Sequence, residues 1–464
     1  MIVQENQATG PHLAESAFSG EPGPEFRPAF RPGFLPALEG LRAVASVGII
    51  GTHVAFQTGH DVGALWERML GRFDFFVAVF FTLSGFLLWR SHRAGYGGVV
   101  WRRRKRARGE AGGPAAASAA ADSSGDSFAA PSSAAPASGT SASAASSPVE
   151  RGSLAAGWAK YYRKRVARIM PAYWVLVVLV LVALPVGDGA NLRTWLTNLT
   201  LTQVYFADSL HGGLTHLWSL SVEVAFYVTL PIFAIALRGL DPMRRQGARI
   251  LALVGLSVLS FGWAWLPLPY PDGVNPHIQP AAYFSWFAAG MIFAEVESLA
   301  GSQSARAREV LATAQRFARL RWLWIGTAVG ALALAAWMGP EGLVELSNWE
   351  FLRRTWCGLV FGAAVIGPWA LAPESRFLTT PVMQALGRWS YGIFLWHMAM
   401  LSVAFPLLGV RIFDGHLLAV SAVTIALTIP LAAASYALVE EPARRWLGRV
   451  WANDARTSAP VSTS

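Results

Sequence analysis

The chain alternates long apolar stretches with short polar segments. Apolar runs of roughly 18 or more residues recur along it, and each is long enough to cross a bilayer as a helix. About ten such helices are predicted, near residues 36–57, 73–90, 169–186, 214–237, 249–268, 281–297, 320–339, 356–373, 388–408 and 416–438. The pattern therefore predicts an all-α polytopic membrane protein.

The polar segments between these runs differ in charge. Arginines cluster after the second, fourth and sixth predicted helices and after the last one, whereas the alternate loops carry mainly Asp and Glu. Because basic loops stay on the cytoplasmic side of a membrane, both termini are expected in the cytoplasm. The Ala-, Arg- and Gly-rich composition is typical of a bacterial gene, so we expect a multi-pass protein of the cytoplasmic (inner) membrane.

Composition supports this interpretation. Of 464 residues, 53% are hydrophobic and 14% are charged, compared with about 25% charged in soluble domains. The net charge of +10 comes from the arginine-rich loops, so it reports topology and no nucleic-acid partner is expected. The single cysteine, Cys357, excludes an intrachain disulfide.

Two polar segments flank the predicted membrane domain of residues 34–446, and a third interrupts it. Residues 1–33 and 447–464 are expected to form a disordered cytoplasmic N-terminal segment and a cytoplasmic C-terminal tail. A cytoplasmic loop, 95–157, interrupts the domain, and most of its residues between 110 and 150 are Ala, Ser, Gly or Pro. Such a composition buries too little apolar surface to fold, so we expect that much of this loop can be deleted without loss of activity.

The first apolar run contains Arg42 and His53. Ionisable residues inside a membrane are costly and usually functional. Eleven residues separate the two, which is about three helical turns, so both side chains project from one helix face about 16 Å apart. The simpler alternative is a pair of interfacial residues whose charged ends reach the membrane surface.

Other apolar runs also contain polar residues. Ser84, next to Gly85, suits either close helix packing or function. Arg165 and Arg168 lie one turn apart at a membrane boundary, where they either report topology or hold a phosphate between two guanidinium groups. Glu223 requires a partner or a proton, and it serves either the chemistry or a structural arginine pair. His397, taken alone, suits a hydrogen-bonded buried histidine.

Together these segments resemble the acyltransferase 3 family of polytopic membrane enzymes. The resemblance extends from about residue 35 to residue 446, without the insert. Its motifs occur in order: the Arg42 and His53 spacing, Phe-Phe-Thr-Leu-Ser-Gly-Phe-Leu at 80–87, the basic segment 165–173, Trp-Ser-Leu-Ser-Val-Glu at 218–223, and the Ser-Tyr to His segment at 390–397.

The resemblance implies transfer of an acyl group, usually acetyl, from a cytoplasmic thioester donor to a hydroxyl group. His53 would be the general base, because the pKa of an ordinary histidine suits this task. Arg42 would orient the donor or stabilise the oxyanion, and Glu223 would fix the tautomer of His53. Arg165, Arg168 and Tyr173 would bind coenzyme A. Supporting residues are expected to be Ser84, Trp218, Ser221, Tyr391 and His397.

No metal or permanently bound cofactor is expected, and acyl-coenzyme A is the donor substrate. The acceptor would be a glycan, a lipid-linked glycan or a secondary metabolite of the cell envelope. An acyl-imidazole intermediate on His53 is an alternative to direct transfer. A transporter that uses Arg42, His53 and Glu223 as a substrate or proton pathway is the alternative function, and a scaffold for glycan assembly is a third.

Overall fold

The computed structural model describes residues 33–92, 148–237, 240, 246–302, 304–340 and 344–457. Within these residues the regular elements are all helices. The α-helices are α1 (Pro36–Gln57), α2 (Leu65–Gly71), α4 (Pro148–Ala183), α5 (Leu192–Leu199), α6 (Trp218–Ala236), α7 (Gln246–Phe261), α8 (Phe284–Glu297), α9 (Ala305–Arg319), α10 (Arg321–Met338), α11 (Asn348–Leu371), α12 (Pro381–Leu408), α13 (Leu417–Ser435) and α14 (Glu441–Thr457). A further helix covers residues 76–92.

Each of the ten predicted ranges coincides largely with helix in the structure. Within the part of the chain that the structure describes, six helical stretches are long and apolar enough to cross a membrane: Leu65–His92, Gly157–Ala183, Thr215–Ala236, Arg321–Met338, Pro381–Leu408 and Leu417–Trp451. The all-helical membrane architecture is confirmed, whereas ten spans and cytoplasmic termini stay predictions. Arg102 to Arg108 and most of the predicted 95–157 loop lie outside the described residues.

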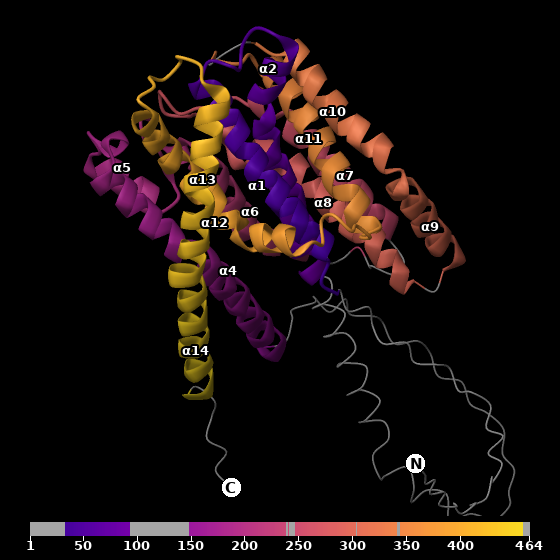
Figure 1. Cartoon of the computed structure of the whole chain (residues 1–464). Coiled ribbons are helices and arrows are strands. Elements are labelled where there is room, and N and C mark those ends of the chain that lie inside the picture. The colour runs from indigo at the N-terminus through magenta and orange to yellow at the C-terminus, as the bar shows by residue number, and fades with distance from the viewer. Residues whose placement is uncertain are drawn as a thin grey trace, which may run out of the picture.

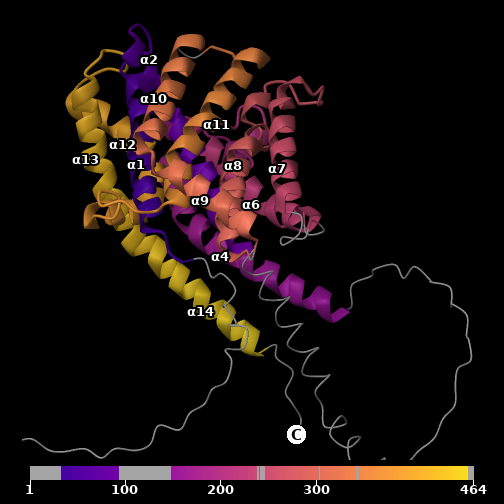
Figure 2. The same ribbon diagram turned by 90° about the vertical axis from the view of Figure 1, so that its right-hand side faces the viewer.

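Two boundaries differ from those predicted. Helix α4 begins at Pro148, ten residues inside the range 95–157, and α14 continues to Thr457, well into the range 447–464. Both extensions project from the same end of the helical bundle (Figures 1 and 2). The two helices contact each other there, and Arg163 of α4 lies over the ring of Trp451 at 5.7 Å. At both places the helix therefore continues beyond the apolar run into polar sequence.

Local signals explain where the central helices begin and end. Proline occupies the first turn of α1 and of α12, where a missing N–H is tolerated. Helix α11 starts with a capping box in which Ser347 and Glu350 satisfy each other's backbone N–H groups. Helix α12 ends at Gly409, whose φ of 67° suits glycine.

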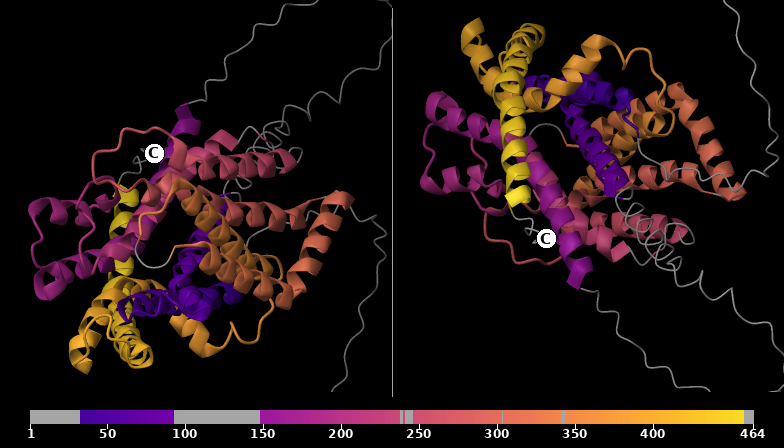
Figure 3. Two further views of the ribbon diagram at one scale, coloured as in Figure 1. Left: turned by 90° about the horizontal axis from the view of Figure 1, so that it is seen from above. Right: turned by 90° about the horizontal axis from the view of Figure 1, so that it is seen from below.

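The helices that carry the polar motifs lie in the centre of the bundle. Helix α1 packs along α12 and also contacts α13, α11 and α2. Seen along the bundle, α5 lies at one margin and α9 and α10 at the opposite margin (Figure 3). The helix 76–92 approaches α8 closely, because a Cβ on Gly85 would overlap the carbonyl oxygen of Phe287. Small residues thus bring two backbones together, as the sequence predicted for Gly85.

Candidate active site

Helix α1 directs both of its ionisable residues towards α12. Arg42 donates from Nε to Ser390 Oγ at 3.1 Å, and the rings of His53 and His397 lie 5.1 Å apart between centroids. Both contacts follow α1 and α12 in the same direction, so these two helices run parallel. The spacing of Arg42 and His53 therefore places them at two levels of one interface.

Three histidines form the first level, which we call the histidine cluster: His53, His216 and His397. The ring of His216 lies 4.8 Å from that of His397 and 6.4 Å from that of His53. His397 is fully buried and His216 is 3% exposed, whereas His53 is half-buried. His53 is thus the most exposed member of the cluster.

Backbone carbonyls fix the protonation pattern of the two buried rings. Nδ1 of His397 lies 2.7 Å from the carbonyl oxygen of Phe394, and Nε2 of His216 lies 3.2 Å from that of Leu395. A carbonyl oxygen only accepts, so each of these nitrogens carries the hydrogen when the ring is neutral. The other nitrogens, His397 Nε2 and His216 Nδ1, are buried and have no hydrogen-bond partner among the described residues.

The second level is a cavity of about 90 Å³, which we call the arginine cavity. Its polar lining comes from several helices: Arg42, Ser84, Arg165, Arg168, Ser219, Glu223, Tyr227 and Tyr391. Apolar side chains, including Phe80 and Phe394, complete the wall. The cavity brings together all three arginines that the sequence predicted for the site, from α1 and α4.

Glu223 is held on the arginine side of the site. Its carboxylate accepts hydrogen bonds from the hydroxyl groups of Ser84 and Tyr227. Glu223 follows His216 by seven positions, and this separation corresponds to about 10 Å along a helix axis. Among the described contacts of Glu223 there is none to His53. The predicted role of Glu223 in fixing the His53 tautomer thus gains no support from these contacts.

The two arginines of α4 differ in exposure. Arg168 is exposed at the cavity, whereas Arg165 is half-buried and its Nε has no hydrogen-bond partner in the described part of the chain. The Arg165 guanidinium lies 5.9 Å from the ring of Tyr227. Glu440, at the end of a π-helical turn Tyr436–Glu440, is close enough for the charges of Arg168 and Arg42 to act on it. Such turns often mark functional sites.

Phe394 connects the two levels. Its side chain lines the arginine cavity, its ring lies 5.4 Å from that of His216 and 6.0 Å from that of His397, and its carbonyl accepts the hydrogen of His397. Phe80 lies 6.3 Å from the same ring. Two aromatic side chains thus stand between the arginine cavity and the histidine cluster.

Four other predicted residues bond to, or pack against, other parts of the protein. Tyr173 is buried and donates to the carbonyl of Asn198, and Ser221 donates to that of Leu217 at 3.4 Å. Trp218 packs on Tyr283. These three are outside the cavity lining, whereas Tyr391 is part of it and donates to the carbonyl of Ile169 at 2.8 Å.

Sequence reasoning missed three residues of this region: His216, Tyr227 and Glu440. Tyr227 follows Glu223 by four residues, a helical spacing that places both on one face. His216 is a polar residue at the start of an apolar span, which is the signal that singled out the other histidines. Glu440 lies two residues beyond the predicted helix 416–438, where no signal marked it as a site residue.

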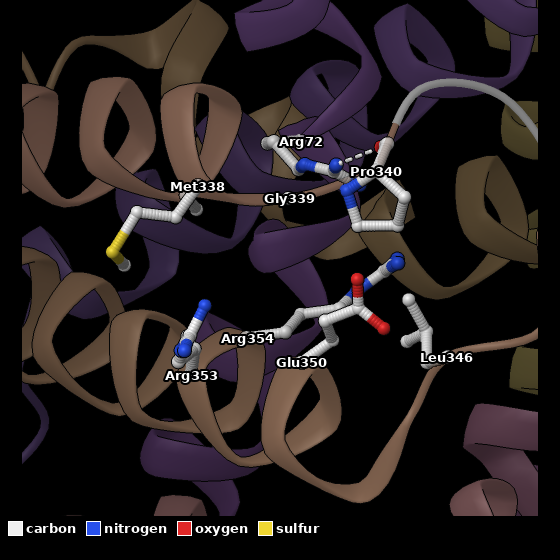
Figure 4. A pocket seen from close by; sticks show the side chains of 9 residues that line it. Arg72, Met338, Gly339, Pro340, Leu346, Glu350, Arg353 and Arg354 are labelled. Carbon is white, nitrogen blue, oxygen red and sulfur yellow. Dashed lines mark hydrogen bonds between the residues drawn. The ribbon is translucent and has the colours of Figure 1, made fainter.

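A second cavity lies near the other end of α1, between α2, α10 and α11. Figure 4 shows its lining, where Arg72 donates to the carbonyl oxygen of Pro340 at 2.7 Å. Its volume is about 10 Å³, which is room for about one water molecule. The arginine cavity is therefore the better candidate for a substrate.

Comparisons with known proteins support the family resemblance over the part of the chain that carries the basic segment 165–173 and the motifs at 218–223 and 390–397. Arg42, His53 and residues 80–87 lie outside the range that the family model matches. Residues 137–436 match the model of the acyltransferase 3 family, described as an acyltransferase domain. Nodulation protein 10 of Rhizobium leguminosarum bv. viciae is 26% identical over 321 residues, which cover 62% of this chain and 76% of that protein. No solved structure matches the chain. The chain belongs to the acyltransferase 3 family and is a membrane acyltransferase.

Proposed function

We propose that this protein transfers an acyl group, acetyl in the simplest case, from cytoplasmic acyl-coenzyme A to a hydroxyl group of a glycan, a lipid-linked glycan or a glycosylated metabolite. The observation that carries the proposal is the pairing of two sites: an arginine-lined cavity beside a cluster of buried imidazoles. Arginine forks suit the phosphates of the donor, and an imidazole suits proton transfer from the acceptor.

In the proposed reaction, the acceptor hydroxyl loses its proton to His53 while its oxygen bonds to the thioester carbonyl carbon. The C–S bond then breaks, and the coenzyme A thiolate recovers the proton from His53. Arg42 lies about 16 Å from His53 along α1, too far to reach the same carbonyl carbon, so we assign it the other predicted role, which is to orient the donor in the arginine cavity. The half-buried position of His53 supports its role as the base, because the other two rings are closed to a substrate.

Arg165 and Arg168 bind the donor phosphates at the entrance of the arginine cavity. The free Nε of Arg165 and the exposure of Arg168 support this assignment. Glu223 lines the same cavity, so we assign it a role there: it positions Ser84 and Tyr227 and balances part of the positive charge. The side chains of Phe80 and Phe394 must move for the thioester to pass from the arginine cavity to His53.

The test uses the purified protein in lipid nanodiscs, with acetyl-coenzyme A and a panel of methyl glycosides as acceptors. We expect acceptor-dependent release of coenzyme A, and a loss of about 10²- to 10⁴-fold in kcat for His53→Gln, because general base catalysis contributes about this much. His277→Gln is the matched control, since His277 stacks on Phe351 outside the cluster. Equal release by wild type and His53→Gln would refute the proposal.

A second measurement separates acyl transfer from transport. In liposomes loaded with acetyl-coenzyme A, the proposed enzyme consumes the thioester when a methyl glycoside is added outside. A transporter would instead move the intact thioester across the membrane. Membership in an acyltransferase family favours the first outcome.

A further inference from the structure

The histidine cluster contains more acceptor atoms than donor hydrogens. The neutral rings of His216 and His397 have each committed their single N–H to a backbone carbonyl. Their remaining nitrogens are bare acceptors, buried and without a partner among the described residues. A buried polar atom without a hydrogen bond costs about 1–3 kcal/mol. Two such atoms side by side indicate that the site is completed by a hydrogen from elsewhere.

Among the described ring contacts of His397, one ring has an N–H that is not already bonded. These contacts are His53, His216 and Phe394. Phe394 has no polar hydrogen, and the N–H of His216 is already bonded. The ring of His53 is closer to His397 than to His216, at 5.1 Å against 6.4 Å between centroids, and is inclined to it by 39°. His397 is therefore the nearer of the two other imidazoles to His53, and a bond between them requires the N–H of His53 to turn towards His397 Nε2.

We propose that His397 is a positioning residue for His53: its Nε2 accepts the N–H of one His53 ring nitrogen and so leaves the other nitrogen bare for the acceptor hydroxyl. In many enzymes a carboxylate fixes the tautomer of the catalytic histidine. Here a neutral imidazole does so, and the carbonyl of Phe394 fixes that imidazole in turn. The inference rests on the proposed role of His53 as the base.

The charged groups around His53 are consistent with this arrangement. The short helix Phe73–Phe75 packs against α1 at His53, where Thr52 donates to the carbonyl of Gly71 at 3.0 Å. It carries Asp74, whose Oδ2 bonds Arg354 on α11 at 2.5 Å and whose Oδ1 is buried without a hydrogen-bond partner among the described residues. Within the same residues no hydrogen bond joins Asp74 to His53. Helix α12 contributes His397, and the segment before α6 contributes His216. The described residues contain no group of three or more His, Cys, Asp or Glu side chains arranged to hold a metal ion.

Two substitutions of His397 distinguish positioning from packing. An asparagine amide replaces the Nδ1 side of the ring, so His397→Asn retains a donor to the Phe394 carbonyl and loses the acceptor for His53. A glutamine oxygen reaches the Nε2 position, so His397→Gln retains an acceptor and loses the bond to Phe394. If His397 positions His53, His397→Asn lowers kcat more than His397→Gln does. If His397 serves only to pack, His397→Gln lowers kcat more.

The experiment measures kcat and KM for acetyl-coenzyme A with a methyl glycoside acceptor in nanodiscs, together with the thermal midpoint of each variant. We expect His397→Asn to lower kcat about 10- to 100-fold, as for other residues that orient a reactive histidine. KM should not change, His397→Gln should recover most of kcat, and the control His277→Gln should match wild type.

Each outcome has a separate meaning. If wild type shows no turnover beyond that of His53→Gln, the proposed function fails and the inference fails with it. If turnover depends on His53 but His397→Asn equals wild type, or His397→Gln loses as much kcat as His397→Asn or more, the positioning role alone is overturned. A variant with a lowered thermal midpoint is compared at a temperature at which it remains folded.

Discussion

At the scale of single residues, the site depends on polar groups that the protein keeps partly unsatisfied. Arg165 has a buried Nε without a partner among the described residues, and Glu440 has a buried carboxylate oxygen in the same condition. Free polar atoms of this kind lower stability, but they remain available to a ligand. Of the two, Arg165 lines the arginine cavity, so it presents an unused hydrogen-bond donor where the acyl donor is proposed to bind.

Arg168→Ala tests the donor site with little risk to the fold, because Arg168 is exposed. A hydrogen bond to a charged group contributes about 1.5–3 kcal/mol, so we expect KM for acetyl-coenzyme A to rise about tenfold or more. Arg168 would bind the donor phosphate equally strongly in the ground state and in the transition state, so kcat should stay near the wild-type value. Arg163→Ala on the same helix is the control, since Arg163 faces Trp451. A similar rise in KM for both variants would indicate a general loss of positive charge.

At the scale of helices, close backbone contact decides how the motifs meet. Helix 76–92 places Ser84 within hydrogen-bonding distance of Glu223. This helix can approach α8 closely because Gly85 and Gly290 have no side chains. A Cβ on Gly290 would overlap the carbonyl oxygen of Thr82, and one on Gly85 would overlap that of Phe287. The Ser-Gly pair of this motif therefore has two uses: the serine lines the cavity and the glycine permits the packing.

Gly85→Ala should destabilise the protein by about 1–3 kcal/mol, because the added methyl meets backbone that cannot rotate away. Gly326→Ala in α10 is the matched control, since no heavy atom lies within 4 Å of the position of its Cβ. There the higher helix propensity of alanine should maintain or raise stability. Thermal midpoints in detergent measure both variants. Equal midpoints for the two would contradict the packing described for helix 76–92.

At the scale of the whole molecule, buried ion pairs connect neighbouring helices. Arg249 of α7 lies 3.2 Å from Glu295 of α8, and both side chains are buried. Trp89 donates to the same carboxylate at 2.7 Å. Beside them, Arg90, the residue that follows Trp89, bonds Glu297 of α8 at 2.6 Å. These contacts join helix 76–92, α7 and α8 far from the histidine cluster.

Glu295→Gln leaves the Arg249 charge buried without a matching anion. Removal of one partner from a buried pair costs about 3–5 kcal/mol, so we expect a large fall in the thermal midpoint. In contrast, Asp414→Asn removes an exposed pair with Arg411, whose side chain is 87% exposed, and should cost less than about 1 kcal/mol. A Glu295→Gln midpoint close to that of Asp414→Asn would show that the pair does not fasten these helices.

The sequence alone determined the membrane class, the helical architecture and the family. Long apolar runs leave a chain no alternative to helices in lipid, because every backbone polar group must be bonded within its own segment. The sequence also indicated Arg42, Arg165, Arg168 and Glu223 as site residues, because a charged side chain in or beside an apolar run has a high free-energy cost in a membrane.

Only the tertiary structure decided which of these residues share a site. Arg42 and Glu223 meet the arginines of α4, whereas His53 meets two other histidines, and Tyr173 and Ser221 are occupied by backbone carbonyls. Periodicity fixes the face of a helix on which a residue lies, but not the helix that this face meets. The partners come from packing between segments far apart in the chain, such as α1 with α12, and this packing depends on the shapes of all the side chains together.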